Sequence, residues 1–103
     1  MEKIKNYLKE RKCFINNYED LRKEIKVIIN APSDKIPEEA LKNAIYLSRK
    51  CEVSIDRMDR LVGEMNKSEK SALEKTIIEV QSKKDGFEKR VLILLLLENV
   101  VKS

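Results

Sequence analysis

Apolar residues recur every three or four positions along most of this 103-residue chain, the spacing that lines one face of an α-helix. In residues 2–30 they fall into two heptad columns. The first column is Ile4, Arg11, Tyr18 and Ile25, and the second is Tyr7, Phe14, Leu21 and Ile28, with Leu8, Ile15 and Ile29 beside them. The pattern predicts one long helix that packs against other helices.

Residues 35–66 carry the same repeat and predict a second helix. Its columns are Leu41, Ser48, Ile55 and Val62, and Ala44, Cys51, Met58 and Met65, with Ala40, Leu47 and Leu61 beside them. Before it, Pro32 disfavours helical geometry at Ala31. Ser33 or Asp34 can then cap the new helix, whose first turn tolerates Pro37. Because the break is short, we expect the two helices to be antiparallel.

A third helix is predicted over residues 68–101. Asn66 or Ser68 can cap its start while Glu69 reaches back in a capping box. Its columns are Leu73, Val80, Phe87, Leu94 and Val101, and Ile77, Lys84, Val91 and Glu98. Both columns stay in phase across Gly86, so we expect one helix that is either straight or kinked at this glycine.

These elements predict an all-α fold, an elongated up-down-up antiparallel three-helix bundle that resembles a coiled coil, with residues 1–103 as a single domain. The chain has only two Gly and two Pro, whereas a β fold needs more turn residues. Helices of this length give a rod of roughly 45 Å. Polar residues in the columns are expected to fix the register of the helices: Arg11, Ser48, Lys84 and Glu98.

The most apolar stretch lies near the end of the third helix, at residues 91–101. A helix that is apolar nearly all round is normally buried on more than one side. Leu92, Ile93, Leu96 and Val100 fall outside the inward columns and form a second stripe. We therefore predict that these four residues bind a partner, either an amphipathic helix of another protein or a second copy of this chain.

Catalytic chemistry is not expected. The chain has no His and no glycine-rich phosphate loop, and its carboxylates mostly precede a basic residue by four positions, as in solvated helix pairs. We expect no enzyme, no cofactor, no metal site and no small-molecule substrate. The net charge is +4, but the basic clusters are interleaved with acids, so nucleic acid is not an expected partner.

The two cysteines are predicted to be free thiols. Cys13 falls off the apolar columns and should be exposed, whereas Cys51 lies in a core column. The chain start lacks the apolar core of a secretory signal, and no run is long enough to span a bilayer. A cytoplasmic protein without a membrane partner is the expectation.

Residues 41–61 carry Arg49 among apolar positions, followed by Ile55, Met58 and Leu61. With the first helix and the acidic break before it, this arrangement resembles small flagellar export chaperones of the FlgN and FliT type, over about residues 4–65. The resemblance implies a cytosolic helical protein that holds the amphipathic C-terminal helix of a secreted filament or hook-associated subunit and hands it to the type III export apparatus.

Three functions remain as hypotheses. The first is a non-enzymatic helix-binding protein, most specifically such a chaperone, in which the stripe of the third helix is the binding surface. The alternative is a structural bundle that self-associates as a homodimer through the same stripe. The third is an accessory protein for nucleic acid or another acidic partner, whose binding would weaken steeply with salt.

Overall fold

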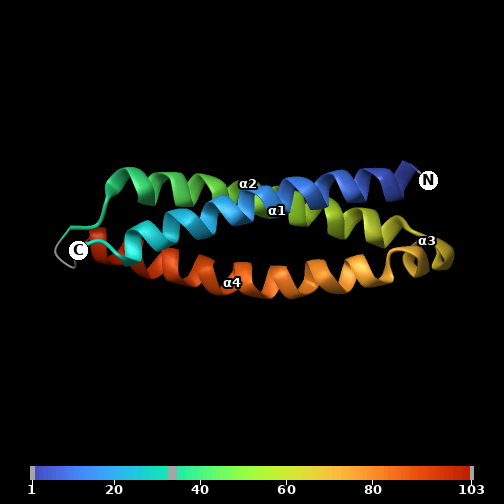
Figure 1. Cartoon of the computed structure of the whole chain (residues 1–103). Coiled ribbons are helices and arrows are strands. Elements are labelled where there is room, and N and C mark those ends of the chain that lie inside the picture. The colour runs from blue at the N-terminus through green and yellow to red at the C-terminus, as the bar shows by residue number, and fades with distance from the viewer. Residues whose placement is uncertain (1, 33–34, 103) are drawn as a thin grey trace.

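A computed structural model of the chain describes residues 2–32 and 35–102, and helices account for most of them (Figure 1). The helices are α1 (Glu2–Ile29), α2 (Glu38–Glu64), α3 (Lys67–Ala72) and α4 (Glu74–Lys102). No strand occurs in the described part of the chain. The predicted all-α class is therefore confirmed.

The three long helices lie side by side along a narrow rod of 53 × 20 × 17 Å. In Figure 1, α1 runs away from the N-terminal end, α2 returns, and α4 runs back to the end where α1 stops. The short α3 lies at the opposite end, between α2 and α4. The last turns of α1 and α4 consequently share one end of the molecule.

The predicted third helix is divided in two, so the expectation of a single helix from residue 68 is wrong. Asn66 caps α3 in the predicted capping box: its side chain accepts from the Glu69 amide at 2.8 Å, and its own amide donates to the Glu69 carboxylate at 2.9 Å. The helix then breaks at Leu73, a turn residue that is itself buried. This break lets α3 close the end of the rod while Leu73 and Met65 stay in the core.

The start of α2 also differs from the prediction. The helix begins at Glu38 rather than residue 35, and Pro37 is its N-cap without a side-chain cap. The physical reason is that a proline disfavours helical geometry in the residue before it, here Ile36. Ser33 and Asp34, the predicted caps, lie outside the described residues.

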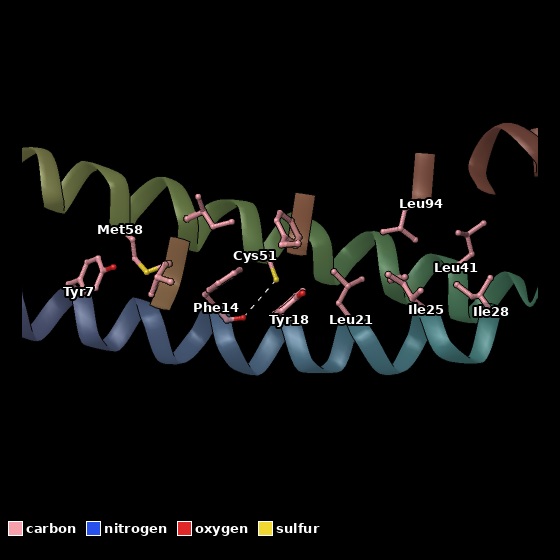
Figure 2. Close-up of a cluster of buried hydrophobic side chains, with 14 of the residues drawn as sticks. Tyr7, Phe14, Tyr18, Leu21, Ile25, Ile28, Leu41, Cys51, Met58 and Leu94 are labelled. Atoms are coloured by element: carbon pink, nitrogen blue, oxygen red, sulfur yellow. Dashed lines mark hydrogen bonds between the residues drawn. The ribbon is translucent and has the colours of Figure 1, made fainter. Parts of the chain in front are cut away.

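The core is formed by most residues of the predicted columns, although the three long helices contribute unequally (Figure 2). Val101, predicted in the inward column, lies in the last turn of α4 and is 46% exposed, so that part of the prediction is wrong. The buried residues of α1 are Tyr7, Phe14, Tyr18, Leu21, Ile25 and Ile28. Those of α2 are Ala40, Leu41, Ala44, Ser48, Cys51, Ser54, Ile55 and Met58. From α4 and the turn before it, Leu73, Val80, Phe87 and Leu94 are buried. The second predicted column of α4 is only half-buried, so this helix docks through a single column.

Small side chains on α2 bring α1 close. Ala44 and Cys51 are fully buried, and close backbone approaches between α1 and α2 are far more frequent than those of either helix with α4. The distance between packed helices follows the size of the side chains at the contact. The α4 helix instead meets the pair through large side chains such as Phe87 and Leu94.

Three aromatic rings join the helices at mid-length. Phe14 stacks on Tyr18 with ring centroids 5.7 Å apart, and Phe87 meets both rings edge-on. A Cβ atom on Gly86 would lie 2.6 Å from the Tyr18 hydroxyl. The α4 helix continues through Gly86, so this glycine provides room for a neighbouring ring inside a helix.

Ion pairs connect each pair of long helices. Arg11 of α1 pairs with Glu79 of α4, and Lys84 of α4 lies 3.1 Å from Asp59 of α2. The α1–α2 pair is Arg57 with Glu10, at 3.3 Å. All are partly exposed, so each contributes at most about 1 kcal/mol. Ser48, predicted to fix register, donates to the Ile45 carbonyl of its own helix at 2.7 Å.

Candidate partner-binding surface

The predicted stripe of Leu92, Ile93, Leu96 and Val100 lies near the C-terminal end of α4. Three of the four side chains are exposed: Leu92 and Val100 at 62% and Leu96 at 66%. Ile93 is half-buried. Leu94 on the opposite face is in the core at 3% exposure. The last turns of α4 thus have two apolar faces, one packed against α1 and α2 and one facing outward.

More apolar surface surrounds the stripe than the sequence analysis assigned to it. Leu95 and Val101 of α4 are also exposed, and so are Val27 and Ile29 in the last turn of α1. Both helices end on the same side of the rod (Figure 1). Leu95 belongs to the same leucine run, so its exposure could have been anticipated from the limited inward face of one helix.

A groove with an acidic rim separates α4 from α2. It has a volume of about 520 Å³. Its lining residues are Glu52, Ile55, Asp56, Asp59, Lys84, Phe87, Glu88, Val91 and Leu92. We call it the acidic groove, because four of these side chains are carboxylates and one is an ammonium group. Leu92 is the one member of the predicted stripe among them.

A groove of opposite charge separates α4 from α1. It has a volume of about 300 Å³. Its lining residues are Glu19, Arg22, Lys23, Ile25, Lys26, Ile29 and Arg90. Arg90 is held in place, because its Nη1 donates to the Tyr18 hydroxyl at 2.8 Å and to the Gly86 carbonyl at 3.1 Å. The outward face of α4 therefore lies between an acidic groove and a basic one.

The acidic groove was missed by the sequence analysis. Glu52, Asp56 and Asp59 are spaced four and three residues apart, so they share one face of a helix. From that spacing, the half of the site that lies on α2 could have been predicted from the sequence. The other half, Glu88 with Val91 and Leu92, faces these acids only after α2 and α4 have packed.

The thiols occupy the predicted places. Cys13 is exposed and Cys51 is fully buried, and both are free. Burial, with a smaller contribution from Glu52, raises the pKa of the Cys51 thiol to about 12, and its Sγ donates to the Phe14 carbonyl oxygen at 4.0 Å (Figure 2). A thiol that stays protonated is a weak nucleophile, so Cys51 is a packing residue.

Residues 2–32 and 35–102 contain neither a cluster of metal-binding side chains nor a helix that could span a membrane. No three Cys, Asp or Glu side chains in this part of the chain come together as a group that could hold a metal ion. None of its helices combines the length and the apolar character needed to cross a bilayer.

The chain was compared with protein-family models, with curated proteins and with solved structures, and none of the three comparisons returned a match.

Proposed function

We propose that the protein is a non-enzymatic helix-binding protein and that the outward stripe of α4 receives an amphipathic helix of its partner. The observation that carries the proposal is the exposure of Leu92, Leu96 and Val100, each above 60%, on a helix whose opposite face is buried. Covering a large apolar side chain contributes up to about 1.5–3 kcal/mol. A short helix with leucines three and four residues apart matches such a row.

The finer architecture belongs to this proposal. We take α1, α2 and α4 as the up, down and up members of an antiparallel three-helix bundle, with α3 as part of the connection. In this arrangement the stripe lies on the side of α4 that faces away from α1 and α2. A partner helix could then lie along α4 without unfolding the bundle.

The most specific form of the proposal is a cytoplasmic export chaperone. Its support is the resemblance of residues 4–65 to chaperones of the FlgN and FliT type, together with the exposed stripe near the end of α4. The partner would then be the amphipathic C-terminal helix of a secreted filament or hook-associated subunit. Such a helix should bind more tightly than a scrambled peptide of the same composition.

The direct test replaces Leu96 with Asp and measures binding of a synthetic helix with leucine on one face and glutamine on the other. We expect Leu96→Asp to weaken binding by about tenfold or more, because a charge replaces an apolar contact. Fluorescence anisotropy of the labelled peptide gives the dissociation constant.

Ile78→Asp is the matched control. Ile78 is 63% exposed and precedes Leu96 by five helical turns, so it lies on the same face of α4 but far from the stripe. Ile78→Asp should leave binding unchanged, and both variants should keep the helicity of the wild type. Equal binding by the wild type and Leu96→Asp would refute the proposal.

A further inference from the structure

The seam between α2 and α4 is incompletely filled. The second column of α4 is only half-buried along its length: Ile77, Lys84, Val91 and Glu98. Next to the acidic groove lies a smaller hollow of about 180 Å³, and the two share Ile55, Asp59 and Lys84 as lining residues. Together they form one furrow along the seam, crossed by the ion pair of Lys84 with Asp59.

The floor of this furrow is apolar. Ile55 and Phe87 are its most buried apolar lining residues, at 7% and 3% exposure, whereas Val91 is half-buried and Leu92 is exposed. The volume accommodates a few large side chains rather than a whole helix. An occupant would therefore lie on the seam and insert its apolar side chains.

The rim of the furrow carries charge of the opposite sign to the whole chain. The chain has a net charge of +4, yet the acidic groove has four carboxylates and a single ammonium group. Lys84 is already paired with Asp59. Glu52, Asp56 and Glu88 have no ion-pair partner among the described residues. An apolar floor beside an acidic rim on α2, with Glu88 on the α4 side, complements a helix with an apolar face flanked by basic residues.

We propose that the α2–α4 furrow binds a basic amphipathic helix, whose apolar side chains enter above Ile55 and Phe87 and whose Lys or Arg residues pair with Glu52, Asp56 and Glu88. This inference rests on the proposed function, since it specifies the charge of the partner helix and its position beside α4. Leu92 connects the two surfaces, because it belongs both to the stripe and to the lining of the acidic groove.

The test compares two synthetic helices that share a leucine face and differ in the polar face, lysine in one and glutamate in the other. The net positive charge of the protein favours the glutamate peptide through unspecific attraction. The furrow predicts the reverse order, with the lysine peptide binding about tenfold more tightly at low salt and the preference shrinking as salt rises. Equal binding, or tighter binding of the glutamate peptide, would overturn the inference.

A triple variant locates the contact. Glu52→Gln with Asp56→Asn and Glu88→Gln should abolish the preference for the lysine peptide. The control removes three exposed acids that do not line the furrow, Asp20→Asn with Glu39→Gln and Glu74→Gln, and changes the net charge equally. The control should keep the preference. If both triple variants behave alike, general electrostatics accounts for the binding and the furrow does not.

The glutamine-faced peptide separates this inference from the proposed function. If Leu96→Asp weakens its binding but the three-acid variant leaves the lysine preference intact, the stripe binds helices and the furrow inference is wrong. If no peptide binds, both are wrong. If the wild type forms a dimer that the furrow variant dissociates, the occupant is a second copy of the chain, which also contradicts the inference.

Discussion

The seam between α1 and α2 and the seams that α4 makes with them are built from different side chains. Between α1 and α2, small residues such as Ala44 and Cys51 permit close approach and leave no exposed surface on either residue. The α4 helix docks through one column of large residues, and the acidic groove beside it, at about 520 Å³, is larger than the two grooves of about 280 Å³ between α1 and α2. In the proposed function this difference becomes a division of roles, in which the hairpin of α1 and α2 supplies most of the packing and α4 presents the surface for a partner.

The two seams should respond differently to added volume, and this is the largest effect we expect. Ala44→Leu adds a bulky side chain at a fully buried site between close helices, so the free energy of unfolding should fall by about 3 kcal/mol. Val91→Leu adds one methylene beside the open acidic groove and should cost less than about 1 kcal/mol. Urea unfolding followed by circular dichroism measures both, and equal losses would remove the distinction between the seams.

The two glycines differ in the space that surrounds them. In Gly86→Ala the new Cβ meets the Tyr18 hydroxyl at 2.6 Å, and the ring cannot easily retreat because it stacks on Phe14. The clash should outweigh the helix propensity of Ala, with a net loss of about 1–2 kcal/mol in the free energy of unfolding.

Gly63 in α2 provides the matched case, since nothing lies within 4 Å of a Cβ there. Gly63→Ala should raise the free energy of unfolding by about 0.5–1 kcal/mol, because only the helix propensity changes. Thermal unfolding of the two variants should shift in opposite directions. A stabilised Gly86→Ala would show that α4 does not approach Tyr18 as closely as described.

A further modest effect concerns pH and the buried thiol between α1 and α2. Below pH 9 the Cys51 thiol is protonated in both states, and its contribution to stability is complete. Between pH 9 and about 12 the unfolded chain loses this proton while the folded chain keeps it, so the free energy of unfolding falls. At about pH 10 the Cys51 part of this loss should be about 1 kcal/mol, and Cys51→Ala should remove that part. A smaller loss should remain from Tyr7, because burial also raises the pKa of its hydroxyl.

Urea unfolding at neutral pH and at about pH 10 gives this difference. Cys13→Ser is the control, because the Cys13 thiol is exposed, and it should leave the alkaline loss of the wild type unchanged. An alkaline loss as large in Cys51→Ala as in the wild type would contradict the assignment to Cys51.

Sequence periodicity predicted the hairpin well and α4 less well. The columns of α1 and α2 are local repeats on helices that cover each other, so residues such as Phe14, Leu21 and Met58 are buried as predicted. On α4 the column with Ile77 and Val91 has the same repeat but is only half-buried. The burial of this column depends on the distance at which large side chains hold α4 from α1 and α2. The sequence pattern of one helix does not contain that distance.

The candidate site shows the same limit. The outward stripe could be predicted, because Leu92, Leu96 and Val100 fall off the inward columns of one helix. The complete acidic groove could not be predicted, because its lining residues come from two helices that are distant in sequence. The role of Gly86 was equally hidden, because the Tyr18 ring that needs its space belongs to α1.

The proposed function requires that the outward stripe of α4 is available to a different protein. Molar mass from light scattering after size exclusion, over a wide concentration range, tests this most directly. We expect the mass of one chain at every concentration, for the wild type and for Leu96→Asp alike. A stable dimer of the wild type that Leu96→Asp converts to a monomer would contradict the account, because the stripe would then be the interface between two copies of this chain.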